Sequence, residues 1–182
     1  MIHTKTLDEE VAFTSEWWSR TVKDEPKLIR WLQKLQQTEI GGFDDWNAYA
    51  DTFKPDDRTL TILSNIADDE LKHSGLIIDV LNNRGYHNSL EQMPSIYWAE
   101  MNAHITDLQT AAAVNYFGEA LAAFRFEILV EHKETPTDIR DLLRIVLPDE
   151  QFHRQTLKRM AGDKLDEFVD LHHRAVAKIR GT

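Results

Sequence analysis

The pentapeptide Asp69-Glu70-Leu71-Lys72-His73 recurs later in the chain as Asp149-Glu150-Gln151-Phe152-His153. Each copy places a carboxylate three residues before an imidazole, and residues at that spacing lie on one face of an α-helix. A further glutamate, Glu39 in the first half and Glu119 in the second, stands 31 residues before the glutamate of each motif. The chain therefore carries one pattern twice, a glutamate followed by Asp-Glu-x-x-His.

Long helical patterns surround both motifs, and proline marks where several of them begin. Pro26, Pro55 and Pro136 stand beside acidic residues at the start of such patterns, which is typical of a helix N-terminus. Alternation of β-branched residues is scarce, so the sequence predicts an all-α fold. The expected helices span about 26–53, 56–84, 106–133 and 137–161, with a shorter one at about 163–179 and an extra N-terminal one at 7–22.

The lengths of the links predict how these helices are connected. The link between the first two long helices and that between the last two are very short, so each pair should form an antiparallel hairpin. The stretch from Gly85 to Ile105, roughly 20 residues, can run the length of a helix of about 40 Å. We therefore expect a four-helix bundle of two hairpins joined by a long crossover, with additional terminal helices. It would form a single domain over residues 1–182, with its core at about 26–161.

The four glutamates of the repeated pattern stand within apolar helix faces. Glu39, for example, lies between Leu35 and Trp46 on a stripe spaced by three and four residues. Solvated charges or salt bridges are the ordinary alternative, but four ionised carboxylates in one apolar core would each cost several kcal/mol. Two divalent cations would balance the four charges, and carboxylate oxygen with imidazole nitrogen suits iron or manganese. The pattern therefore predicts a dinuclear metal site.

This succession of ligands on four helices resembles that of the ferritin-like di-iron carboxylate proteins, over about residues 26–161. The resemblance implies two iron ions, with manganese or a mixed manganese–iron pair as alternatives. It also implies that Asp69 holds His153 and that Asp149 holds His73, contacts that would fix the orientation of each imidazole. The metal ligands that it implies are Glu39, Glu70, His73, Glu119, Glu150 and His153.

The resemblance does not identify a single subfamily. The chain has no cysteine, so it lacks the cysteine-held iron module of rubrerythrins. Leu71 stands where bacterioferritins carry a methionine for haem, and the 38 residues before Glu39 exceed what storage cages have there.

Six protein ligands for two metals leave coordination positions open, and such positions allow a metal to activate oxygen or peroxide. The resemblance thus favours a di-iron oxygenase or oxidase that acts on a small organic molecule near Gly42 and Ala122. A ferroxidase or peroxide scavenger is the alternative, and a non-enzymatic, metal-stabilised helical bundle is a second. Tyr116, one turn from Glu119, is a candidate redox or proton partner of the metals, although a buried tyrosine with a hydrogen bond is the commoner case.

Composition limits the partners. The formal net charge is −10, and no basic stripe is present, so nucleic acid is an unexpected partner. The sequence has no apolar run of membrane-spanning length, and we expect a cytoplasmic protein without a signal peptide. A homodimer is left open. We interpret the histidines outside the motifs as surface or helix-end residues: His104, His132, His172 and His173.

Overall fold

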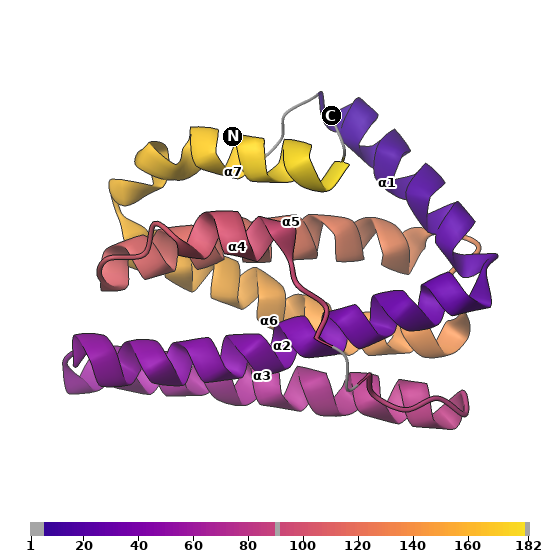
Figure 1. Ribbon diagram of the computed structural model, residues 1–182, viewed down its shortest axis with the longest axis horizontal. Helices are drawn as coiled ribbons and strands as arrows, with labels where there is room; N and C mark the ends of the chain where they lie inside the picture. The colour runs from indigo at the N-terminus through magenta and orange to yellow at the C-terminus, as the bar shows by residue number, and fades with distance from the viewer. Residues whose placement is uncertain (1–5, 90–91, 181–182) are drawn as a thin grey trace. The chain divides into compact units, whose positions relative to one another are not determined.

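The computed structural model describes residues 6–89 and 92–180, and within these ranges the chain is all-α, with seven helices and no strand (Figure 1). The all-α expectation is confirmed, and each of the six expected helices is present with ends within two residues of those predicted. The helices are α1 (Leu7–Val22), α2 (Glu25–Phe53), α3 (Asp57–Asn83), α4 (Ile96–Asn102), α5 (Leu108–Glu131), α6 (Thr137–Ala161) and α7 (Lys164–Arg180). The short helix α4 lies in the stretch that we expected to be a link.

Aspartate side chains begin three of the long helices. The carboxylates of Asp24, Asp56 and Asp107 each accept a hydrogen bond from the backbone N–H three residues later, at the starts of α2, α3 and α5. Such a cap satisfies an N–H that has no partner within the helix, and it stabilises a helix by about 1 kcal/mol. At the other end of α2, Lys54 adopts a left-handed conformation (φ 45°) and ends the helix.

The helices pack into two compact units. The first, the α2–α3 unit, comprises Trp18–Met93 and Lys133–Val146, and the second, the α5 unit, comprises the described residues of Met1–Trp17, Pro94–His132 and Leu147–Thr182. Helix α6 continues through Pro148 and contributes residues to both units.

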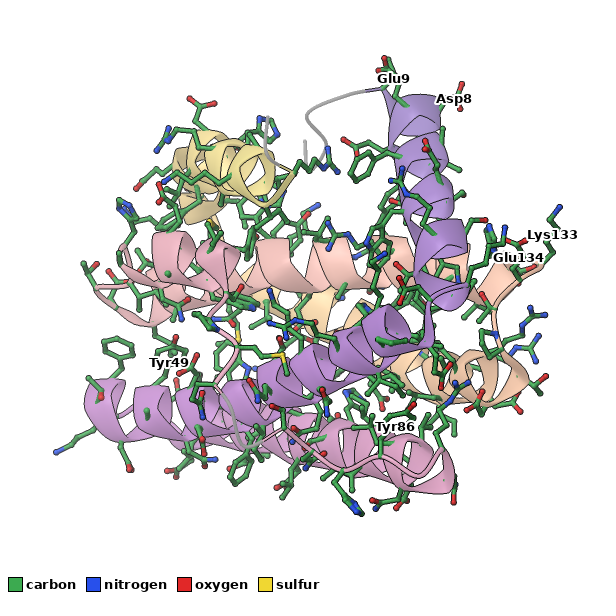
Figure 2. The ribbon with its side chains drawn as sticks, turned by 45° about the vertical axis from the view of Figure 1, so that its right-hand side comes forward. Asp8, Glu9, Tyr49, Tyr86, Lys133 and Glu134 are labelled. Carbon is green, nitrogen blue, oxygen red and sulfur yellow. The ribbon has the colours of Figure 1, made fainter. Side chains whose placement is uncertain are left out.

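Helices α2 and α3 lie side by side and antiparallel (Figure 1). Polar contacts along the pair set the register: Gln36 donates from Nε2 to Ser74 Oγ at 3.0 Å, and one turn further along α2, Glu39 faces His73. Both helices also carry buried apolar side chains, namely Leu28, Leu32, Trp46, Leu63, Ile66, Ile77 and Leu81. Tyr49, labelled in Figure 2, extends the aromatic packing on α2 through its ring contacts with Trp46 and Phe53.

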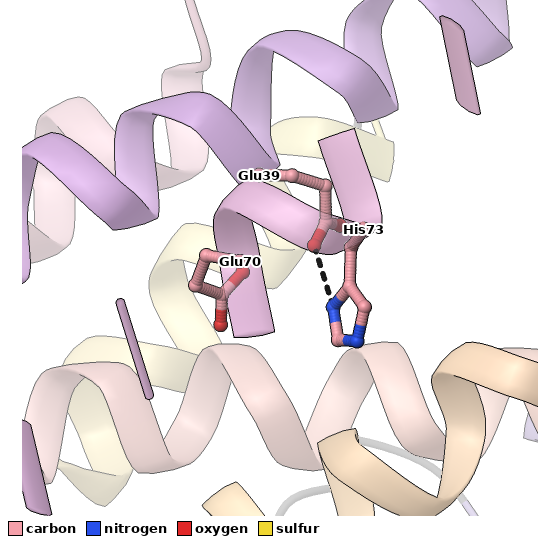
Figure 3. A group of neighbouring side chains, drawn as sticks. All are labelled: Glu39, Glu70 and His73. Atoms are coloured by element: carbon pink, nitrogen blue, oxygen red, sulfur yellow. Dashed lines mark hydrogen bonds and ion pairs between the residues drawn. The ribbon is translucent and has the colours of Figure 1, made fainter. Parts of the chain in front are cut away.

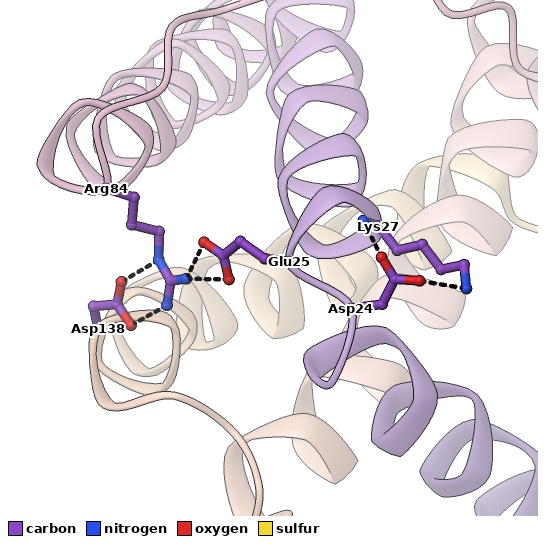
Figure 4. A network of polar contacts seen from close by, with 5 residues as sticks. All are labelled: Asp24, Glu25, Lys27, Arg84 and Asp138. Carbon is purple, nitrogen blue, oxygen red and sulfur yellow. Dashed lines mark hydrogen bonds and ion pairs between the residues drawn. The ribbon is translucent and has the colours of Figure 1, made fainter.

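Charged side chains fasten three helix ends of the α2–α3 unit together. The guanidinium of Arg84, at the end of α3, donates two hydrogen bonds to Asp138 at the start of α6, at 2.6 and 2.8 Å (Figure 4). The same guanidinium donates to Glu25 at the start of α2. The bidentate contact with Asp138 and the contact with Glu25 hold the end of α3 against the starts of α6 and α2.

Helix α5 packs against α4 and α7 in the α5 unit, and its first turns are rich in buried alanine. Trp98 of α4 lies against Gly118 of α5, where a Cβ atom would come within 2.2 Å of the tryptophan ring. Beside it, the Tyr97 hydroxyl and Nδ1 of His172 are hydrogen-bonded at 2.8 Å, which ties α4 to α7. Among the described helices, none combines the length and apolar character that crossing a membrane requires.

Candidate metal centre

Three buried side chains meet in the α2–α3 unit: Glu39 from α2, and Glu70 and His73 from α3 (Figure 3). We call them the Glu39 triad. Each offers one ligand atom, and these atoms all lie within 4.8 Å of one another. The side chains are 5%, 6% and 0% exposed, respectively. Two carboxylates and one imidazole thus converge in a region from which bulk water is largely excluded.

The sequence places this triad through helix geometry. Glu70 and His73 share one face of α3 because they are three residues apart. The short link between α2 and α3 makes the helices antiparallel, which brings the middle of α2 opposite the middle of α3. The caps at Asp24 and Asp56 fix where both helices begin, so Glu39 faces His73.

The separation of the ligand atoms suits a bound cation. Nδ1 of His73 lies 3.3 Å from Oε2 of Glu39. Two atoms that each bind one cation at about 2.1 Å, at near-right angles, are about 3 Å apart. Carboxylate oxygen with imidazole nitrogen is also a donor set that iron and manganese accept. The residues present therefore fit a transition-metal ion by both chemistry and spacing.

Gly42 gives the carboxylate of Glu70 its space. A Cβ atom at Gly42 would lie 3.2 Å from Cγ and 3.3 Å from Oε2 of Glu70. Gly41, its neighbour in sequence, would meet nothing within 4 Å. Helix α2 can therefore approach the Glu70 side chain this closely because Gly42 has no side chain.

The α5 unit holds the second set of predicted ligands, which we call the Glu119 triad: Glu119 on α5 with Glu150 and His153 on α6. Glu150 is 3% and His153 0% exposed, whereas Glu119 is half-buried. A carboxylate oxygen of Glu119 and a ring nitrogen of His153 lie within 4.8 Å of each other. The second half of the repeated pattern thus also produces buried carboxylate and imidazole side chains.

The two aspartates that precede the motif glutamates are less buried than the ligand candidates. Asp69 is about one-third exposed and pairs with Lys72 at 3.8 Å, one turn along α3. Asp149 is half-buried on α6. The expected contacts of Asp69 with His153 and of Asp149 with His73 stay predictions.

Tyr116 is half-buried, and its ring lies 5.1 Å from that of Phe117. Both interpretations of Tyr116, as a partner of the metals and as an ordinary hydrogen-bonded tyrosine, stay predictions.

One histidine outside the repeated motif is more buried than expected. We interpreted His172 as a surface or helix-end residue, which is wrong: it is fully buried in the middle of α7. It bonds to Tyr97, and its ring stacks on that of Phe117 at 4.7 Å. The signal was present, because His172 lies on the apolar face of α7 with Phe168 and Val176. Burial raises the pKa of the Tyr97 hydroxyl well above its ordinary value, so this tyrosine stays protonated at neutral pH.

Each unit therefore supplies two carboxylates and one imidazole, and the donor set of one is repeated in the other. No protein-family model, no curated protein and no solved structure matches the chain.

Proposed function

We propose that this protein is a dinuclear metal oxidoreductase of the ferritin-like kind, in which α2, α3, α5 and α6 form a four-helix bundle. The Glu39 triad and the Glu119 triad together would hold two iron ions, with manganese or a mixed pair as alternatives. The observation that carries the proposal is the Glu39 triad itself, three ligand-type side chains, each at most 6% exposed, with ligand atoms within 4.8 Å of one another.

Electrostatics supports a cation at this place. Glu39 and Glu70 bring two carboxylates close together where little water reaches them. Repulsion between like charges and the loss of hydration both disfavour such a pair. A divalent cation removes the repulsion and replaces the lost hydration. Its binding energy would therefore add to the stability of the folded chain.

The bound metals would supply the ability to bind and reduce oxygen or peroxide. The chain's own part is to hold them and to restrict what reaches them. His73 is fully buried and keeps its imidazole against Glu39, while the apolar side chains of Ile66 and Ile77 exclude water from the same stretch of α3. Gly42 keeps α2 clear of Glu70. A small organic molecule is the substrate class that we favour.

Metal analysis tests the proposal. We expect about two iron or manganese ions per purified chain, and none in the double variant Glu70→Ala/Glu150→Ala. Asp68→Ala is the matched control, because Asp68 is exposed on α3 two residues before Glu70. Full metal content in the double variant, with its helical content unchanged, would show that these residues are not the ligands.

Oxygen uptake by the iron(II)-loaded protein separates the oxidoreductase from iron handling. We expect uptake to end once the bound iron is oxidised, and to resume only with a reductant and an organic substrate. Continued oxidation of added iron(II) without an organic substrate would indicate a ferroxidase and contradict the proposal.

A further inference from the structure

A buried tyrosine and a buried histidine of the α5 unit form a hydrogen-bonded pair that the proposed metal site does not use. The hydroxyl of Tyr97, on α4, and Nδ1 of His172, on α7, lie 2.8 Å apart. Tyr97 is 5% exposed and His172 is fully buried. Two apolar side chains of similar shape would join these helices equally well, because a buried hydrogen bond contributes little net stability. The pair is therefore a candidate for a chemical role.

The contact has the geometry that lets a proton move from one residue to the other. Burial raises the pKa of the Tyr97 hydroxyl well above its ordinary value, so the phenol keeps its proton at neutral pH. In the tautomer of His172 that carries its proton on Nε2, Nδ1 accepts the hydrogen bond that the phenol donates. An imidazole has an ordinary pKa of about 6.5 and is a ready proton acceptor. The proton has to cross only one short hydrogen bond to reach it.

Loss of an electron is the reaction that such a pair makes possible. A phenol that loses one electron becomes a strong acid and must release its proton. With Nδ1 of His172 in place, the O–H bond of Tyr97 breaks and an N–H bond forms as the electron leaves for a one-electron oxidant. The products are a neutral phenoxyl radical and an imidazolium. Because both side chains are buried, His172 replaces the water that would otherwise take the proton.

Aromatic rings connect this pair to α5. The ring of His172 stacks on that of Phe117, with centroids 4.7 Å apart and an angle of 20° between the planes. Phe117 stands two residues before Glu119, the α5 member of the Glu119 triad. The ring of Tyr97 lies edge-on to that of His172 at 5.7 Å. These rings form a continuous series of close contacts, along which an electron can pass from Tyr97 to the helix that carries Glu119.

We propose that Tyr97 is a redox-active tyrosine, oxidised by one electron as its proton passes to Nδ1 of His172. In the metal-loaded protein the oxidant is the metal centre after its reaction with oxygen or peroxide, and in this respect the inference rests on the proposed function. Tyr97 thus adds one electron to those that two metal ions supply for the reduction of oxygen or peroxide. Neither residue is a metal ligand candidate, so the pair can be oxidised and measured without iron.

The experiment uses the full-length chain loaded with zinc, which is redox-inert and accepts the same donor atoms. Photogenerated tris(bipyridine)ruthenium(III) is the one-electron oxidant, and electron paramagnetic resonance detects the radical. We expect a long-lived tyrosyl signal that narrows in protein made with ring-deuterated tyrosine. Tyr97→Phe should abolish this signal. Tyr86→Phe is the matched control and should keep it, because Tyr86 is exposed at the surface.

The role of His172 has its own measurements. His172→Gln keeps a hydrogen-bond acceptor of much lower basicity, and it should slow radical formation by about 100-fold, the lower end of what a positioned proton acceptor contributes. In the wild type, radical formation should be slower in D₂O, after exchange of the buried proton, than in H₂O. Circular dichroism checks that the variants keep their helices. A long-lived tyrosyl signal in folded Tyr97→Phe, or equal rates in D₂O and H₂O, would overturn the inference.

Addition of oxygen to the iron(II)-loaded chain separates this inference from the proposed function. A Tyr97 radical under oxygen as well as under ruthenium(III) would support both. A radical under ruthenium(III) in a chain that binds no iron and takes up no oxygen would support the redox pair while the proposed function failed. Oxygen uptake by the iron-loaded chain without a Tyr97 radical would overturn the inference and leave the proposed function intact.

Discussion

Nδ1 of His73 on α3 lies 3.3 Å from Oε2 of Glu39 on α2, and the imidazole is fully buried. This relationship links two residues that are 34 positions apart in the sequence. The orientation of the imidazole therefore depends on how α2 packs against α3, and not on α3 alone. A change at either residue therefore alters the ligand set without removing the helices that carry it.

His73→Gln should abolish metal binding at the Glu39 triad. A glutamine side chain keeps polarity but presents an amide, which is a much weaker ligand than imidazole. The loss of affinity should exceed the roughly 100-fold that marks the upper end for residues outside the ligand shell. Titration of the metal-free protein with iron(II) or manganese(II) measures it. His87→Gln, an exposed histidine after α3, is the control, and equal affinity of the two variants would contradict the assignment.

Gly42→Ala should weaken metal binding while Gly41→Ala should not. A methyl group at position 42 would come within 3.2 Å of Glu70, so the carboxylate must shift by a few tenths of an ångström. A methyl group at position 41 meets nothing within 4 Å and should stabilise α2 by up to about 1 kcal/mol, since alanine favours helices over glycine. Chemical unfolding and metal titration of both variants measure the two effects. Identical metal affinities would mean that Glu70 adapts freely.

Asp69→Asn and Asp149→Asn should each keep the fold and lower metal affinity by about 10- to 100-fold, if these aspartates orient imidazoles. The alternative for Asp69 is its surface pair with Lys72, which is about one-third to one-half exposed and contributes little stability. Lys72→Met removes that pair and leaves the aspartate. Weak metal binding in Asp69→Asn together with normal binding in Lys72→Met would support the orienting role, whereas normal binding in both aspartate variants would refute it.

Local signals in the sequence were sufficient for the helices and for the ligand candidates. Caps such as Asp24 and Asp56 and prolines such as Pro26 act over one turn, so helix starts are predictable without tertiary information. The repeated motif has a fixed helical spacing, which places Glu70 and His73 on one face of α3 by local geometry alone.

The features that the sequence does not predict depend on tertiary contacts. The seven-residue helix α4 offers too few turns for a periodic pattern, and its position depends on the fit of Trp98 against Gly118. The partner of His172 is Tyr97, 75 residues away, and no local rule pairs them.

Gly118→Ala should destabilise the α5 unit, although alanine is the better helix former. The added methyl group would lie 2.2 Å from Cη2 of Trp98 and 2.8 Å from Cζ2, so the ring must move. Overpacking of this kind costs about 1–3 kcal/mol. Gly75→Ala on α3 is the control, since a methyl group there meets nothing within 4 Å. Chemical unfolding, with tryptophan fluorescence as the signal, measures both. A gain in stability for both variants would show that Trp98 rotates away at no cost.

Asp138→Asn should lower stability at neutral pH and have a smaller effect in acid. The hydrogen bonds from Arg84 hold the pKa of Asp138 below its ordinary value of 3.8. A carboxylate with a lowered pKa in the folded state contributes stability above the pKa of the unfolded chain, and this contribution is lost as the pH falls through the folded pKa. The difference between wild type and Asp138→Asn should therefore stay constant from pH 7 to about 5 and shrink as the pH falls from there through the lowered pKa of Asp138.

The size of this effect is modest because the Asp138 side chain is 40% exposed and solvent screens the pair. We expect roughly 0.5–1 kcal/mol at pH 7 from urea unfolding. Asp141→Asn is the matched control on the same helix, since Asp141 is exposed and its contact with Arg144 is 3.7 Å long. Its effect should be close to zero at every pH. A difference for Asp138→Asn that disappears already at pH 6, or an equal loss in both variants, would show that the contact with Arg84 does not stabilise the start of α6.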